Sequence, residues 1–272
     1  MMPSIRVFLT LCGLAVLPYT PGQTAEPPLE PPPPAVLARA LEAVGIDAIL
    51  DDVAPALDDA LPDACGEGDV AFRRTVFQSS RLRSTFERSL SAQLDLSTLA
   101  AVGRWYDSAE GRAVARHEAA SSTLADDDVA ARIPTIAGAA DWPQRKALVR
   151  ATLQGSRTAP FLTRFHSTLD GIVTRAEHCH PDAATLARLD DERSEALDNE
   201  SFVALFIDIE LIVPTAVIYD GLPDATLQAY ARFASSPAGA RWFNALQHSV
   251  GETLQAAGDR YVRSRLSPNA ER

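Results

Sequence analysis

The sequence predicts an all-α fold, a helical bundle built from two related halves. Apolar residues recur at helical spacing, most regularly in residues 158–177, and no segment alternates as a strand does. The pattern LPDATLQAYARFASSPAG at residues 222–239 also repeats LDLSTLAAVGRWYDSAEG at residues 94–111 in constant register. Each copy combines one apolar helical stripe with a turn before a second helix. Each copy therefore predicts a helix corner.

Both predicted corners carry an aromatic residue, a serine and a glycine at matched positions. A serine hydroxyl can accept a hydrogen bond from the free N–H groups that begin a helix, so we interpret the serines as N-caps. The glycines fall at the third position of that helix, where a missing side chain allows close backbone approach despite a cost of about 0.5–1 kcal/mol. A nucleophilic serine would instead call for a G-x-S-x-G elbow. The motif residues are Leu99, Trp105, Ser108, Gly111, Leu227, Phe233, Ser236 and Gly239.

The second copy belongs to a longer pattern that includes Tyr219 and spans residues 212–243. This stretch resembles the core of a bacterial family known only as a domain of unknown function, whose exported helical members carry E-L-x-x-x-x-x-F-Y-x-S-x-x-G. Residues 94–111 form a weaker second match. Thr226 and Ala234 replace the acidic residue and the tyrosine of the family pattern. The resemblance implies export and a helical fold, and it implies no catalytic residue.

The two ends of the chain predict an exported protein with a spacer. Residues 1–25 show a charged start, an apolar run and small residues, the order of a secretory signal peptide. Residues 26–34, EPPLEPPPP, form a proline-rich linker that cannot be helical. We expect one helical half at 35–155, a second at 156–266 and a disordered tail at 267–272. The predicted location is periplasmic or secreted, in a bacterium, without a transmembrane segment in the mature chain.

Glycine, proline and capping residues set the expected helix boundaries. Gly45 separates the first two helices, Asp141 caps a later helix and Gly155 ends it. Residues 182–219 turn almost wholly apolar in their second part, which predicts burial on all sides. Outside the corners, the other expected helices are 35–44, 46–60, 69–94, 126–139, 158–177 and 237–265.

The net charge argues against one class of partner, and the distribution of charge leaves open whether a basic helix binds an anionic ligand. A net charge of −11 argues against nucleic acid or an anionic membrane as a general partner. Residues 47–63 are acidic and the next helix, 69–94, is basic. We interpret the basic helix as packing beside the acidic segment or facing solvent, and the alternative is that it holds an anionic ligand.

Asp208 and Glu210 are the candidate ligand-binding residues. They stand in the apolar segment 202–219, where an unpaired carboxylate would be costly and its pKa would rise. At positions i and i+2 they point to different sides of a helix, so they do not form an acid/base pair by themselves. An arginine partner from another helix is the structural alternative.

The cysteines of the mature chain predict a disulfide. Cys65 and Cys179 are its only two, and an oxidising compartment favours their pairing. Residues 177–180, EHCH, could instead bind a metal, but their spacing matches no standard zinc site. We therefore expect no metal and no cofactor.

The function expected from the sequence is a non-enzymatic binding or interaction module of the cell envelope. Its partner would be an envelope protein or a small ligand, held in a groove between the halves or near residues 202–219. The alternatives are a carrier for an apolar ligand, and a hydrolase or metal-dependent enzyme that uses Asp208 and Glu210. The oligomeric state is left open.

Overall fold

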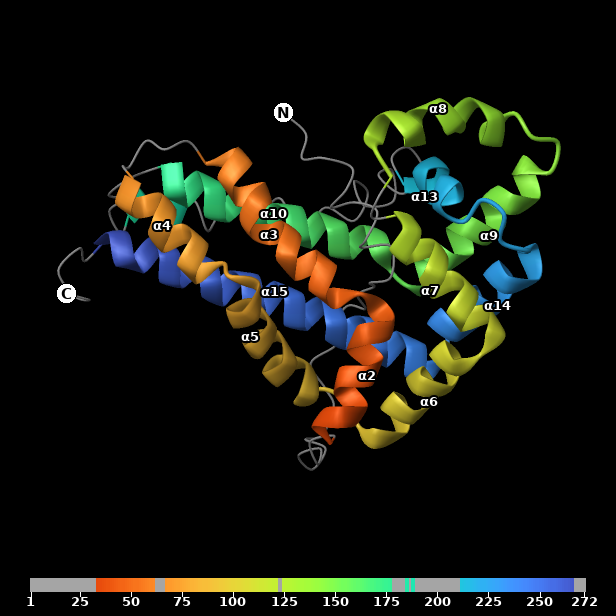
Figure 1. The fold of residues 1–272 in the computed structure, drawn as a ribbon, viewed down its shortest axis with the longest axis horizontal. Coiled ribbons are helices and arrows are strands. Elements are labelled where there is room, and N and C mark those ends of the chain that lie inside the picture. The colour runs from red at the N-terminus through yellow and green to blue at the C-terminus, as the bar shows by residue number, and fades with distance from the viewer. Residues whose placement is uncertain are drawn as a thin grey trace.

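The computed structural model describes residues 33–61, 67–121, 124–177, 184–185, 187–188 and 211–266. Within these ranges the regular elements are helices and no strand occurs, so the predicted all-α class is confirmed. The predicted signal peptide and tail lie outside the described residues. The helices, shown in Figure 1, are α2 (Pro34–Val44), α3 (Ile46–Ala60), α4 (Glu67–Val76), α5 (Ser79–Ser91), α6 (Leu96–Asp107), α7 (Ala109–Ser121), α8 (Asp126–Ala137), α9 (Trp142–Gly155), α10 (Thr158–Glu177), α13 (Ile212–Ile218), α14 (Asp224–Ala234) and α15 (Pro237–Leu266).

Helix α15 runs through the bundle over 30 residues. Helices α4, α5, α6, α10 and α14 pack along it, as Figure 1 shows for its length in blue. Neither α15 nor any other helix of the described ranges is both long and apolar enough to cross a membrane. The apolar stripe predicted for α15 is buried, as helical spacing requires. Its members are Phe243, Leu246, Val250, Leu254, Ala257 and Tyr261.

The first two helices meet at Gly45, as the sequence predicts. Gly45 has φ 69°, in the left-handed region that glycine adopts without steric cost, and its N–H donates to Glu42 O. Helix α2 begins at Pro34, the last residue of the linker predicted for residues 26–34. Proline fits this first position, because the first residue of a helix needs no N–H.

The single helix predicted for residues 69–94 is wrong. Helix α4 ends at Val76 and α5 begins at Ser79, and Gln78 between them has extended backbone, with φ −60° and ψ 128°. Phe77 is fully buried, and its ring meets the ring of Tyr261 edge-on with centroids 5.8 Å apart. The next buried side chain, Leu82, is not at i+3 or i+4 from Phe77. One straight helix would not place both on the same face, so the chain turns between them.

Helices α4 and α5 pack beside the acidic helix α3, which confirms the structural interpretation of the basic segment. Asp58 pairs with Arg73 and Arg74, each at 2.8 Å, and Arg83 pairs with Asp47. Burial raises the pKa of Asp58, but the hydrogen bonds from the two arginines outweigh burial and the net pKa is lowered. These three guanidinium groups are therefore occupied by carboxylates of the same chain.

Helix α9 begins without the cap predicted at Asp141. The Asp141 side chain makes no hydrogen bond to the helix, and its backbone, with φ −88° and ψ 0°, is outside the β region that capping residues adopt. Pro143, in the first turn, has no N–H to be capped. The predicted end at Gly155 is confirmed, and α10 has the predicted bounds, Thr158–Glu177.

Candidate functional site

The ligand-binding and disulfide residues chosen from sequence lie outside the described residues. This applies to Asp208 and Glu210, the predicted ligand contacts, and to Cys65 and Cys179, the predicted disulfide pair. Their roles stay predictions. The site that follows is built from other side chains.

The described histidines lie on three different helices. His117 Nδ1 is 3.2 Å from Ile218 O, and His248 Nε2 is 3.8 Å from a Glu252 carboxylate oxygen. Burial lowers the pKa of His166. In the part of the chain that the structure describes, no three His, Cys, Asp or Glu side chains gather as metal ligands.

The first helix corner joins α6 to α7 through Ser108. The Ser108 hydroxyl accepts from the Gly111 N–H at 2.9 Å and donates to Trp105 O at 2.6 Å. Gly111 lies against the same carbonyl, since a Cβ built on it would be 2.0 Å from Trp105 O. The serine caps α7, and the glycine lets α7 start directly against the end of α6.

The second helix corner, between α14 and α15, repeats these contacts at Ser236. The Ser236 hydroxyl accepts from the Gly239 N–H at 3.1 Å and donates to Phe233 O at 2.6 Å. A Cβ built on Gly239 would again be 2.0 Å from a carbonyl oxygen, here that of Phe233. Both corners therefore use one serine and one glycine in the same way.

The two corners pack against each other through their matched aromatic residues. The rings of Trp105 and Phe233 stack with centroids 4.8 Å apart and 7° between their planes. Trp105 also stacks on Tyr230, with centroids 5.7 Å apart. Helix α6 packs on α15 and α14 packs on α7, so the first helix of each corner lies on the second helix of the other (Figure 1).

A carboxyl group from the first corner is held by tyrosine hydroxyls where the corners meet. Tyr219 Oη donates to Glu118 Oε1 at 2.7 Å. Burial raises the pKa of Glu118 to about 7, although hydrogen bonds from Tyr219 and Tyr230 act in the opposite direction. Burial, and then the charge of Glu118, raise the pKa of Tyr106. The surroundings of Glu118 therefore favour the neutral form of its carboxyl group.

Glu118 is absent from the residues predicted from sequence, because it stands in a polar run that resembles a solvent-facing surface. The signal that could have found it is the repeat. In the register of the two copies, Glu118 corresponds to Leu246, which is fully buried, and Tyr106 corresponds to Ala234. A carboxylate at the counterpart of a core leucine indicates a polar group that is partly withdrawn from water.

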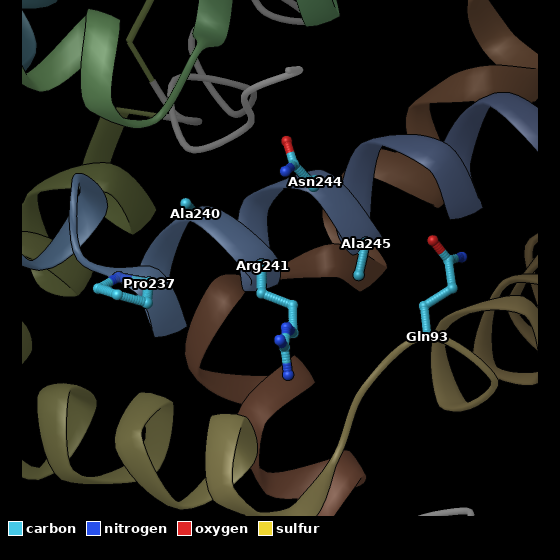
Figure 2. A pocket seen from close by; sticks show the side chains of 6 residues that line it. All are labelled: Gln93, Pro237, Ala240, Arg241, Asn244 and Ala245. Atoms are coloured by element: carbon cyan, nitrogen blue, oxygen red, sulfur yellow. The ribbon is translucent and has the colours of Figure 1, made fainter. Parts of the chain in front are cut away.

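A groove of about 360 Å³ runs beside the first turns of α15 (Figure 2). Positions i, i+3, i+4, i+7 and i+8 of the helix form one stripe of its lining, and Gln93 joins them from the α5–α6 connection. Gln93 Nε2 donates to Ser249 Oγ at 3.0 Å, which fixes the amide in place. The apolar lining residues are Pro237, Ala240 and Ala245, and the polar ones are Gln93, Arg241 and Asn244.

The polar lining residues differ in how much of their hydrogen-bonding capacity is in use. Arg241 pairs with Asp95. The pKa of Asp95 falls to about 2, first because it accepts the Thr98 N–H. Gln93 donates only through Nε2, and Asn244 accepts only through Oδ1. Among the described residues, Gln93 Oε1 and Asn244 Nδ2 have no partner, so the groove offers one free acceptor and one free donor.

Arg157 lies next to the groove, where its Nη1 donates to Asn244 Oδ1 at 3.3 Å. It occupies the turn between α9 and α10 with φ 52°, in the left-handed region that non-glycine residues rarely adopt. Ser156 and Thr158 on either side are fully buried and share a hydrogen bond of 2.9 Å, which holds the turn. Arg157 pairs with no described carboxylate, and burial lowers its pKa to about 10.

Comparison with known proteins gives no relative. No family model, no curated protein and no solved structure matches the chain. The resemblance of residues 212–243 to a bacterial family therefore stays a prediction, and the function is argued from the geometry of the groove.

Proposed function

We propose that this protein is an exported, non-enzymatic binding module of the bacterial cell envelope and that its ligand occupies the groove beside α15. The groove itself carries the proposal. It combines Gln93, from the predicted first half, with a stripe of α15, from the predicted second half. This is one of the two places where the sequence leads us to expect a ligand. A volume of about 360 Å³ is in the range of small-molecule sites.

The chemistry of the groove favours binding over catalysis. Two amides, one guanidinium and apolar surface line it in the described part of the chain. None of these groups is the carboxylate, imidazole, thiol or hydroxyl that an acid, a base or a nucleophile requires. Gln93 is held by Ser249, and Arg241 is held by Asp95, so the lining is already ordered before a ligand arrives.

Export is the second part of the proposal and rests on residues 1–25. If these residues are a signal peptide, the mature chain begins near the proline-rich linker at 26–34. The linker would then separate the leader from the first helix, α2. An oxidising compartment would also allow the predicted disulfide between Cys65 and Cys179.

The test is a native, non-reducing mass spectrum of the full chain, expressed with its own leader and recovered from the periplasm. We expect cleavage near residue 25, a mass lower by the two hydrogens of one disulfide, and an excess mass that disappears on denaturation. Cytoplasmic recovery of an uncleaved chain would contradict export. A native mass equal to the bare chain at every periplasmic preparation would contradict a resident small ligand.

Two tryptophan variants test whether the ligand binds in the groove. Ala240→Trp fills the groove, and Ala256→Trp adds the same ring to an exposed position of α15 away from it. We expect Ala240→Trp to lose the excess mass and Ala256→Trp to keep it, with both proteins helical by circular dichroism. Retention of the ligand by the folded Ala240→Trp variant would overturn the groove as its site.

A further inference from the structure

The free polar atoms of the groove complement a peptide backbone. Gln93 Oε1 can accept from a peptide N–H, and Asn244 Nδ2 can donate to a peptide C=O. Figure 2 shows the two amides on either side of Ala245. Pro237 and Ala240 extend the lining with small apolar surfaces. A ligand that alternates donor and acceptor groups and carries short side chains would satisfy both amides at once.

Arg157 adds a positive charge to one side of this arrangement. Its guanidinium reaches Asn244, has no carboxylate partner among the described residues, and is partly withdrawn from water. Arg241, in contrast, is already paired with Asp95. A partly buried cation without an anion is unfavourable, so an anionic group placed beside Arg157 and Asn244 would gain charge-assisted hydrogen bonds.

The acceptor atom of Gln93 distinguishes among anions. A sulfate presents only acceptor oxygens at neutral pH, and Gln93 Oε1 would have nothing to accept from it. The net charge of −11 also disfavours a multiply charged anion. A peptide C-terminus has the required combination, since it carries a single negative charge and has an N–H group next to it.

We propose that the groove binds the C-terminal end of a peptide, with the α-carboxylate at Arg157 and Asn244 and a backbone N–H on Gln93 Oε1. Capture of a terminal carboxylate by fixed donors is a known mode of peptide recognition. The inference rests on the proposed function, because it names the ligand class of the same groove. The turn that holds Arg157 between the buried Ser156 and Thr158 would keep the guanidinium in place before binding.

The experiment is an NMR titration of the mature protein that follows the side-chain amide signals of Gln93 and Asn244. The probes are N-acetyl-Ala-Ala with a free carboxylate and the same dipeptide with a C-terminal amide. We expect both signals to shift with the acid, and the acid to bind roughly tenfold more tightly than the amide, as one charge-assisted hydrogen bond provides. The Ala240→Trp variant should bind neither probe.

Three variants test the role of Arg157. Arg157→Gln should remove the preference for the acid, while Arg157→Lys should keep part of it, because lysine retains the charge but not the planar fork. Arg260→Gln is the matched control, since it makes the same change of charge at an exposed position near the far end of α15. It should leave the preference unchanged.

A ten-residue peptide that ends in Ala-Ala identifies the source of the C-terminus. Binding equal to that of the dipeptide would support recognition of a protein tail, and much weaker binding would support a free short peptide. Equal affinities of the acid and the amide would overturn the inference and leave the groove as a binding site. If neither probe shifts the groove signals, the peptide inference is wrong, while the mass spectrum of Ala240→Trp still decides the proposed function.

Discussion

The two helix corners have the same backbone contacts and different side-chain surroundings. Ser108 and Ser236 make matching hydrogen bonds, and Gly111 and Gly239 lie equally close to the carbonyl oxygen of the preceding aromatic residue. These positions satisfy the geometry of the turn itself. The corner backbone therefore constrains the serine and the glycine, and it leaves the neighbouring positions free to differ.

The first corner contains the polar groups and the second is apolar at the matched positions. Glu118 and Tyr106 correspond to Leu246 and Ala234. The half-buried carboxyl group is thus a property of one corner and not of the motif. Shared contacts together with the crosswise packing of the four helices favour two related halves, which stays a prediction from the repeat.

The largest expected effect comes from adding a methyl group to either corner glycine. Gly111→Ala and Gly239→Ala would each place Cβ at 2.0 Å from a backbone carbonyl oxygen, which cannot move without displacing a helix end. Each variant should lose roughly 3 kcal/mol of unfolding free energy, the upper part of the range for overpacking. Urea denaturation measures both losses. If one variant is as stable as the wild type, the two corners do not share this constraint.

A second expected difference between the corners is a dependence of stability on pH that comes from Glu118. Its pKa is 4.5 in an ordinary environment and about 7 in the folded protein, so the folded state binds the proton more tightly. The unfolding free energy should therefore fall as pH rises from about 4.5 to 7, by about 3 kcal/mol for this group. Above pH 7 its contribution is constant. Urea midpoints between pH 4.5 and 8 measure the trend.

Glu118→Gln isolates this group from the other titrating residues. Glutamine keeps an oxygen that can accept from Tyr219 but carries no charge. The variant should be more stable than the wild type at pH 8, and the difference between them should shrink as pH falls below 7. If the unfolding free energies of the two proteins change with pH in parallel, Glu118 does not titrate in this range. The proposed electrostatic difference between the two corners would then be wrong.

Much of the helical content could be predicted because the apolar spacing is local information. The bounds of α10 and the corner helices follow from such spacing and from capping residues. The break between α4 and α5 depends on Phe77 packing against Tyr261, which is far away in the sequence. Local propensity carries no information about that contact, so the segment by itself predicts one long helix.

The site could be predicted less well than the fold, for the same reason. Glu118 is half-buried against Tyr219, in the turn after α13, and Tyr230, on α14, and its own neighbours in sequence are polar. The groove likewise requires Gln93 to meet α15, and Arg157 to reach Asn244 across the bundle. The sequence instead indicates the carboxylates of an apolar run, because an apolar run predicts burial without knowledge of packing.

The serine caps should have a smaller effect and nearly the same one in both corners. Ser108→Ala and Ser236→Ala each remove an acceptor for a helix N–H, which costs about 1 kcal/mol. Ser84→Ala, at an exposed position of α5, is the control and should change stability by less than about 0.5 kcal/mol. Thermal unfolding of the three variants gives the values. If the stability losses of Ser108→Ala and Ser236→Ala differ from each other by more than Ser84→Ala changes stability, one of the two serines has a further role.

The smallest expected effect is a gain in stability. It concerns a position where the two corner motifs differ and no contact explains the difference. Gly103 on α6 corresponds to Ala231 on α14. A Cβ built on Gly103 meets nothing within 4 Å, so alanine would gain helix propensity at no steric cost. Gly103→Ala should raise the unfolding free energy by about 0.5–1 kcal/mol in urea denaturation. A loss of stability would instead mean that α6 is packed more closely than α14 at this turn, and that its glycine, like those of the corners, is required by contact.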